Sequence, residues 1–177
     1  RAPLRRRRRL TCPPAPGPEA DTSSAPGETR VVEIHEFGPD DDADTVGTLF
    51  TSIDPTSSVA AGVAEVEVAG FVDDPAAFLL GAYVGHEPVG LAWGVHMKYP
   101  SGRLTTYLHQ LDVRQEYRRR GIGTALVSAA MDLGRRRGAD RFWLSTGGHN
   151  VAAQAVYESL GGDRKPLGDV NYWWTLD

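Results

Sequence analysis

Cysteine is almost absent from this sequence, because Cys12 is the only one among 177 residues. A single thiol cannot form an internal disulfide. The sequence also lacks the paired cysteine or histidine spacing that is typical of a zinc site. Glycine, aspartate or arginine interrupts every apolar run well short of the ~18 residues that a membrane-spanning helix needs. The sequence therefore predicts no metal, no membrane partner and a reducing, cytoplasmic location.

Positive charge is scarce outside the first 30 residues. The formal net charge is -4, but residues 1–30 carry seven arginines against three acidic residues, whereas residues 31–177 carry 12 basic and 20 acidic residues, a net charge of -8. A field of that sign attracts cations and repels nucleic acid. We therefore expect a cationic small-molecule partner and no nucleic acid, and homodimer formation is left open.

Residues 1–30 also contain little that a core could bury. They combine arginines at 5–9, a proline-rich stretch at 13–18 and a Ser/Thr/Gly tract, a composition typical of disordered chain. The arginines fit a nucleic-acid or membrane-surface arm or a solvated tail, and the solvated tail is the simpler interpretation. Leu10 begins no apolar core of the ~7–15 residues that a signal peptide needs, so secretion is not expected. We predict a disordered tail over 1–30 and one folded domain over 31–177.

Apolar periodicity and turn residues predict the elements of the folded part. Strands are expected at residues 31–34, 78–84, 89–95, 104–113, 141–144 and 170–176. Helices are expected at residues 41–50, 56–72, 121–138 and 150–160. The β-branched content of 56–72 also fits a strand, and the helix is favoured by its spacing of apolar residues. This order predicts an α/β fold, with a mixed sheet and helices on both faces.

A strand, a turn and a helix follow one another between Val113 and Gly123. Three consecutive arginines occupy the turn, and the helix starts at Gly121. Such a turn directs free backbone N–H groups and the positive end of a helix dipole at one point, and the glycines permit a ligand to approach. The pattern predicts a pyrophosphate site, the alternative being a solvated basic loop. No Gly-Lys-Ser/Thr of a P-loop follows, and the third glycine of a dinucleotide fingerprint is missing.

The spacing Arg118-x-x-Gly121-x-Gly123 after this strand resembles the Arg/Gln-x-x-Gly-x-Gly/Ala signature of the GNAT N-acetyltransferases. The resemblance implies a GNAT-like α/β fold with a mixed, mostly antiparallel central sheet, and acetyl-CoA as the acyl donor. It also implies that amides of the turn hold the CoA pyrophosphate while the strand backbone pairs with the pantetheine arm. The cofactor-binding residues so implied are Leu111, Asp112, Val113, Arg118, Arg119, Arg120, Gly121, Ile122, Gly123, Thr124 and Ala125.

A second part of the GNAT pattern is present at Asn150, Ala153 and Tyr157. It resembles the family's helix in which Asn contacts the CoA arm and Tyr gives a proton to the departing thiolate. The three residues lie on one face of a helix, where Ala153 leaves room for the ligand. The resemblance thus assigns cofactor binding to all three and a catalytic role to Tyr157. The alternative for Tyr157 is a packed core aromatic.

Within the family, residues 74–78 and 107–113 are most similar to the aminoglycoside 3-N-acetyltransferases. Those enzymes usually carry a carboxylate at the position of Gln110, and an amide cannot act as a base at neutral pH. Strand alternation places Gln110 and Asp112 on one face and His109 on the other. Asp112 is therefore the candidate base, with an exposed strand-end acid and a water chain as alternatives.

We predict direct transfer of acetyl to a primary amine of a polycationic small molecule, an aminoglycoside antibiotic acetylated at the 3-N position. An amide near Val113 would hold the oxyanion. The rivals are a GNAT acting on a protein N-terminus, a lysine or a polyamine, and a non-catalytic acyl-CoA-binding module. A group of acids lies in the segment where the family usually builds its acceptor site; most are interpreted as surface charge, and together they favour a polycationic acceptor. They are Asp40, Asp41, Asp42, Asp44, Asp54, Glu65, Glu67, Asp73 and Asp74. Core or interface positions are expected for four tryptophans, and a ligand cage is the less favoured alternative. They are Trp93, Trp143, Trp173 and Trp174.

Overall fold

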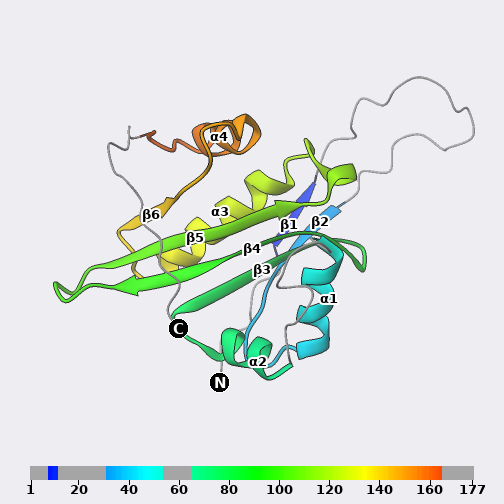
Figure 1. The fold of residues 1–177 in the computed structure, drawn as a ribbon, viewed down its shortest axis with the longest axis horizontal. Helices are drawn as coiled ribbons and strands as arrows, with labels where there is room; N and C mark the ends of the chain where they lie inside the picture. The colour runs from blue at the N-terminus through cyan, green and yellow to red at the C-terminus, as the bar shows by residue number, and fades with distance from the viewer. Residues whose placement is uncertain (1–7, 12–30, 54–64, 165–177) are drawn as a thin grey trace, which may run out of the picture.

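One six-stranded sheet forms the centre of the molecule (Figure 1). The computed structural model describes residues 8–11, 31–53 and 65–164 of the chain. The strands follow one another in sequence order across the sheet, and neighbours are antiparallel except β5 and β6, which are parallel. The expected mixed, mostly antiparallel sheet is confirmed. Their bounds are β1 Arg8–Thr11, β2 Val31–Glu36, β3 Ala77–Val84, β4 Glu87–Lys98, β5 Leu104–Val113 and β6 Arg141–Leu144.

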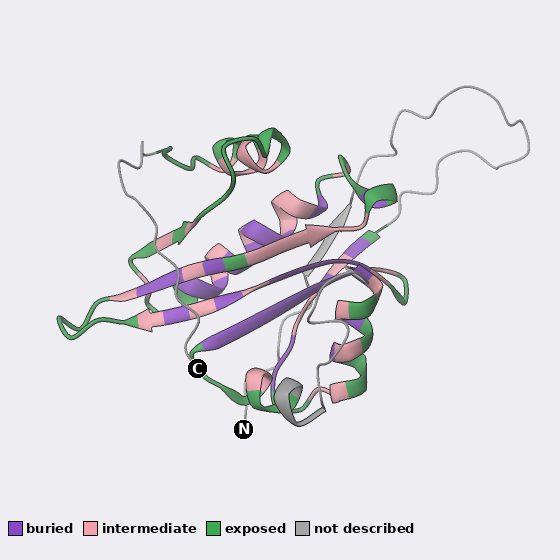
Figure 2. Cartoon of the chain, in the orientation of Figure 1, coloured by how far each residue is buried: buried purple, intermediate pink, exposed green. Residues whose placement is uncertain are grey.

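Helices cover both faces of the sheet, as predicted. On one face α1 packs on β4 and α2 on β3, while α3 crosses the strands on the other and contacts α4. Leu79 and Leu80 are neighbours in β3 and belong to the two different cores, because successive strand residues point to opposite faces. Figure 2 shows β3 buried along most of its length. The helices are α1 Ala43–Ile53, α2 Glu65–Asp73, the 3-10 helix η1 Gln115–Tyr117, α3 Ile122–Arg136 and α4 Val151–Ser159.

Helix α3 lies close against β5 because small residues face the strand. A Cβ at Gly134 would stand 2.6 Å from Thr106 Oγ1, so only glycine fits at this crossing. The helix ends at Gly138, whose φ of 84° is in the left-handed region. The amide of Ala139 then bonds the Gly134 carbonyl at 2.9 Å, as in a Schellman cap. The predicted C-terminal stop at Gly138 is confirmed.

Strands β5 and β6 pair over four residues only. Their register runs from Thr105 opposite Arg141 to Leu108 opposite Leu144, although β5 continues to Val113. Among the described residues, the outer edge of β5 beyond Leu108 therefore has no strand partner. The separation of β5 from β6 opens the sheet next to the start of α3 (Figure 1).

The structure corrects one expectation about the tail. Residues 8–11 form β1, antiparallel to β2 with Arg8 opposite Ile34, so disorder is the wrong prediction for these four residues. Strand pairing uses backbone groups, and a segment poor in apolar side chains can still add to a free sheet edge. The helix expected over 56–72 is confirmed for its described part, α2. The other residues of the tail and the strand expected at 170–176 lie outside the described residues.

Candidate active site

The loop before α3 has the geometry of an anion site. Gly121 is the N-cap of α3, with a φ of 78° that favours glycine, and Arg119 shares the left-handed region with a φ of 59°. The first α-helical hydrogen bond runs from Ala125 N to Gly121 O at 2.9 Å. The amides of Ile122, Gly123 and Thr124 precede that bond and lie at the positive end of the helix dipole. Such a helix start suits a pyrophosphate.

Strand β5 and helix α4 both lie close to Gly123 of α3. A Cβ built there would stand 3.9 Å from side-chain carbons of Leu111, Val113 and Val156, which belong to β5 and α4. These are ordinary van der Waals distances, so the protein itself has room for a methyl group at this position. Packing within the protein therefore does not require glycine at position 123. The absence of a side chain instead allows a ligand to approach the backbone closely. The residues at this loop therefore fit the CoA pyrophosphate.

The three arginines of the turn point in different directions. Arg118 Nε donates to the Val113 carbonyl at 2.8 Å, which holds its guanidinium beside the end of β5. The Arg120 guanidinium lies 5.2 Å from the centroid of the Tyr117 ring, a cation–π distance. Arg119 is exposed. The expected cationic loop thus has two arginines fixed by neighbours.

A group of side-chain hydrogen bonds, which the sequence did not reveal, joins this loop to the β3–β4 hairpin. Glu87 accepts hydrogen bonds from Arg114 and from the Tyr117 hydroxyl, each at 2.6 Å, and Arg114 also pairs with Glu116. The bonds from Tyr117 and Arg114 lower the pKa of Glu87, so its carboxylate stays charged. The buried Tyr117 ring is thereby fixed beneath Arg120. No local pattern joins Glu87 to residues 27 and 30 positions away.

Tyr157 lies on α4, half-buried against the core of the α3 face. Burial and then the nearby negative charge of Asp112 raise its pKa above the ordinary 10.0. Its hydroxyl therefore keeps its proton at neutral pH and can donate it. Asp112 acts on this hydroxyl from a different element, since Asp112 belongs to β5 and Tyr157 to α4. Tyr157 is thus both a packed aromatic and a possible acid, so the two interpretations are compatible.

Asn150 begins α4 as its N-cap. Its side-chain oxygen accepts from the Ala153 amide at 3.2 Å, which is the usual stabilisation of a helix start. Gln154 donates to the carbonyls of Gly147 and Gly148 and fixes the preceding loop. The side-chain oxygen of Asn150 is thus used within α4, and a contact of Asn150 or Ala153 with CoA stays a prediction.

Gln110 and Asp112 lie together on β5, as strand alternation predicts. Gln110 Nε2 donates to Asp112 Oδ2 at 2.5 Å, and the Trp93 indole N–H donates to Gln110 Oε1 at 2.7 Å. An indole nitrogen can only donate, so the oxygen of the Gln110 amide must face Trp93 and its NH2 must face Asp112. Gln110 consequently holds the Asp112 carboxylate in place, a role that residue spacing did not show.

His109 is not on the opposite face from Gln110, which corrects the alternation argument. The β4–β5 register changes between Trp93, opposite Gln110, and Gly94, opposite Leu108. His109 is the extra residue of this β-bulge, and its ring stacks on Trp93 with centroids 4.2 Å apart and planes at 17°. A bulge shifts the alternation by one residue, so His109 joins the side of Trp93 and Gln110.

Asp41 and Asp74 of the acidic set between residues 40 and 74 each accept a hydrogen bond from a nearby backbone amide. Asp41 accepts from the Gly38 amide at 2.8 Å and lies 2.7 Å from His35, while Asp74 accepts from the Ala76 amide at 2.7 Å. They fix the turns before α1 and after α2. Asp54 and the side chains of Glu65 and Glu67 lie outside the described residues, and the remaining acids of the set are exposed.

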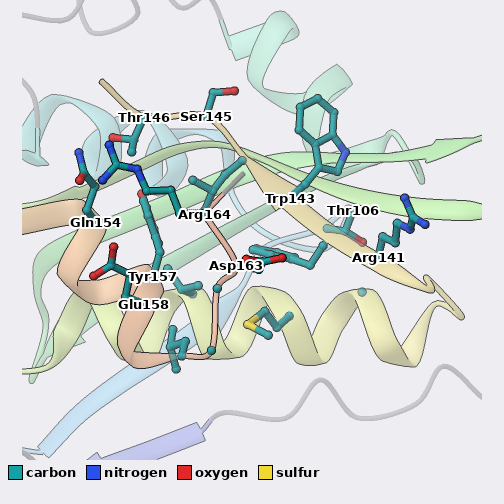
Figure 3. Close-up of a pocket in the computed structure, with 18 of the residues that line it drawn as sticks. Thr106, Arg141, Trp143, Ser145, Thr146, Gln154, Tyr157, Glu158, Asp163 and Arg164 are labelled. Atoms are coloured by element: carbon teal, nitrogen blue, oxygen red, sulfur yellow. The ribbon is translucent and has the colours of Figure 1, made fainter. Parts of the chain in front are cut away.

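A cavity of about 650 Å³ lies between α3, β6 and α4 (Figure 3). Tyr157 is the only predicted site residue among its described lining residues. The cavity reaches Gly134 and Arg135 in the last turns of α3, the negative end of the helix dipole, which does not suit a phosphate. Gly161 to Arg164 form another wall. The cavity is therefore distinct from the anion site before α3.

Comparison with known proteins now decides the family. The family model described as the acetyltransferase (GNAT) family matches residues 44–162. The chain belongs to the GNAT family. A curated relative, the ribosomal protein bS18-alanine N-acetyltransferase of Escherichia coli strain K12, is 37% identical over 70 residues, 40% of this chain and 47% of that protein. The match therefore spans about half the length of that relative.

Solved structures share the GNAT fold over most of the chain. An aminoglycoside acetyltransferase from an uncultured soil metagenomic sample superposes with a TM-score of 0.74 at 22% identity, covering 81% of this chain and 99% of that chain. An aminoglycoside N-acetyltransferase in complex with CoA superposes with a TM-score of 0.64 at 16% identity, covering 86% and 99%. At these identities the likeness supports the fold alone.

Membership of the GNAT family confirms the expected fold class, the expected enzyme class and acetyl-CoA as the family's acyl donor. The amine that receives the acetyl group, and the 3-N subfamily, stay predictions. In the part of the chain that the structure describes, no helix is long and apolar enough to cross a membrane. Over the same residues, no group of three or more His, Cys, Asp and Glu side chains could hold a metal ion.

Proposed function

We propose that this GNAT protein transfers acetyl from acetyl-CoA to a primary amine of a polycationic small molecule of the aminoglycoside class. The observation that carries the proposal is the glycine-capped start of α3 beside the end of β5, whose outer edge has no strand partner among the described residues. The Tyr157 hydroxyl and the Asp112 carboxylate would supply the two proton-handling groups that amine acetylation needs. The anion site before α3 lies at the adjoining end of the same strand.

Each group has a role that follows from its chemistry. Acetyl-CoA supplies the activated thioester, and the amides from Ile122 to Thr124 with the guanidinium of Arg118 would hold its pyrophosphate. The outer backbone of β5 up to Val113 would pair with the pantetheine arm and provide an N–H to the oxyanion. Tyr157 would donate a proton to the departing sulfur. Asp112 would accept the proton of the amine.

The choice of acceptor rests on charge. The net charge of -8 over residues 31–177 favours a polycation, and Asp112 offers an ion partner for an ammonium group. Two solved structures with the same fold are aminoglycoside acetyltransferases. Acetylation at the 3-N position is the finer part of the proposal, drawn from the similarity at residues 74–78 and 107–113.

A protein N-terminus is the second candidate acceptor. It is favoured by the 70-residue match to an enzyme named for acetylating the alanine of a ribosomal protein. The cofactor half of the site would be the same for either acceptor, since both donate a primary amine. The two candidates differ in charge, because a peptide end carries one ammonium group where an aminoglycoside carries several.

The test is a thiol-release assay with acetyl-CoA and a panel of gentamicin, spermidine and an alanine-starting peptide. We expect gentamicin to be the best acceptor, with a KM that rises with salt because the Debye length shortens from ~10 Å at 0.1 M to ~3 Å at 1 M. Turnover with the peptide alone would replace the aminoglycoside assignment by the N-terminal one. Acetyl-CoA binding without turnover on any amine would indicate a binding module.

A further inference from the structure

A row of aromatic rings crosses β4, β5 and β6 on the face that carries α1 and α2. The ring centroids of Trp143 and Tyr107 are 4.3 Å apart, those of Tyr107 and His109 are 5.9 Å apart, and those of His109 and Trp93 are 4.2 Å apart. We call these four residues the aromatic shelf. The bulge at His109 makes the row continuous, because it turns that ring toward Trp93.

One end of the shelf is partly buried and the other is exposed. Phe71 of α2 packs edge-on against Trp93, 5.5 Å between centroids, within the core of the α1 and α2 face. Trp143 is 44% exposed, and His109 is exposed as well. Figure 3 shows the Trp143 side chain projecting from β6 away from α3. A contiguous group of aromatic rings, of which two are exposed and two partly exposed, is typical of an interaction site rather than of a core.

The partly buried end of the shelf, Trp93, is linked to the candidate base. Trp93 donates to Gln110, and Gln110 donates to Asp112, so a chain of two hydrogen bonds joins the aromatic rings to the carboxylate. Aromatic ring faces attract cations, and a carboxylate attracts them more strongly. The combination selects a ligand that carries positive charge at more than one point along its length.

We propose that the aromatic shelf binds the body of the acceptor, a ring-containing polycationic amine. Trp143 and Tyr107 hold an ammonium group and the saturated ring that bears it, while another amine of the same molecule lies at Asp112. A peptide N-terminus carries its single ammonium group at the reacting end and would leave the shelf without a cation. This inference rests on the proposed function and narrows its acceptor to molecules with at least two separated amines.

The test compares Trp143→Ala with Trp143→Phe, which keeps a ring, and with Tyr99→Ala, which removes an exposed aromatic outside the shelf. Steady-state KM values for gentamicin and for acetyl-CoA are measured for each variant. We expect Trp143→Ala to raise the gentamicin KM about tenfold, the scale of one well-placed cation–π contact, and to leave the acetyl-CoA KM within about twofold. Trp143→Phe should stay within about threefold of wild type, and Tyr99→Ala within about twofold.

A second measurement separates the shelf from the reaction. Gentamicin should quench the tryptophan fluorescence of the wild-type protein without acetyl-CoA, and most of that change should be lost in Trp143→Phe. If no amine is acetylated but this quenching persists, the proposed function fails while the shelf stands as a binding site. An unchanged gentamicin KM in Trp143→Ala, an equal rise in the acetyl-CoA KM, or a rise confined to the alanine-starting peptide would each overturn the inference.

Discussion

The two sides of strand β5 differ in the kind of group that they offer to a ligand. Toward α3, the candidate cofactor site consists of backbone amides at Gly121 to Thr124 and the free edge of the strand. Toward α1 and α2, the candidate acceptor site consists of side chains from three strands. A backbone site depends on a few torsions and small residues, so one substitution can abolish it. A side-chain site divides binding among several groups, and each loss is partial.

Tyr157 is the proposed proton donor to the CoA sulfur, and its loss should have the largest effect. Phe at this position keeps the packing of the ring and removes the hydroxyl proton. We expect kcat to fall by about 10²-fold or more, the scale of a lost general acid, with acetyl-CoA affinity nearly unchanged. Because the pKa of Tyr157 is raised above 10.0, its ionisation should not depress wild-type activity between pH 7 and 9. Rate measurements with Tyr99→Phe as control check this, and a wild-type kcat would leave Tyr157 a packing residue.

Gly123→Val tests the backbone site directly. The fold has space for a Cβ there, at 3.9 Å from its nearest neighbours, so the variant should stay folded. A side chain that displaces the pyrophosphate should cost about 10²-fold in acetyl-CoA affinity, the scale of a misplaced group. Calorimetric titration with CoA measures this. Gly47→Val in α1, where a Cβ meets nothing within 4 Å, is the matched control. Unchanged CoA binding in a folded Gly123→Val protein would contradict the anion site.

Asp112→Asn tests the other side. The change keeps the shape and removes both the candidate base and an ion partner of the acceptor. Loss of a general base usually slows a reaction by about 10²-fold or more, and a water chain that replaces the base would reduce the loss. We therefore expect kcat/KM for gentamicin to fall about tenfold or more, while CoA binding changes little. A variant that loses CoA affinity and acceptor turnover equally would place Asp112 with the cofactor instead.

The smallest expected effect concerns stability rather than binding. His96 is buried, with Nδ1 2.9 Å from Thr106 Oγ1, and burial and then Arg137 lower its pKa below 6.5. Its depressed pKa means that the unfolded chain takes up the proton first as pH falls below about 6.5. The free energy of unfolding should therefore decline from pH 7 toward pH 5 and level off below the folded-state pKa. Thermal melts of wild type and His96→Gln check this, and equal pH slopes would contradict it.

The sequence located most elements because they depend on local patterns. The strand Leu104–Val113 was predicted with its observed bounds, and Gly138 and Gly161 end their helices as expected. The loop at Gly121 was recognisable for the same reason, since a helix start after a strand and two glycines are contiguous signals. Strand β1 was not predicted, because edge pairing depends on a free neighbouring edge and not on composition.

The sequence by itself indicated the family, a candidate cofactor loop and the shared face of Gln110 and Asp112, because each is specified within a few consecutive residues. Only the tertiary structure decided which groups surround them. Strand register and one bulge bring His109 and Trp93 together, and the packing of α4 places Tyr157 against the core on the α3 face. These contacts join residues that are far apart in the chain. They depend on strand pairing and helix packing, which the local sequence pattern does not specify. The fold therefore decides which residues contact one another, while the residue types decide what chemistry those contacts can perform.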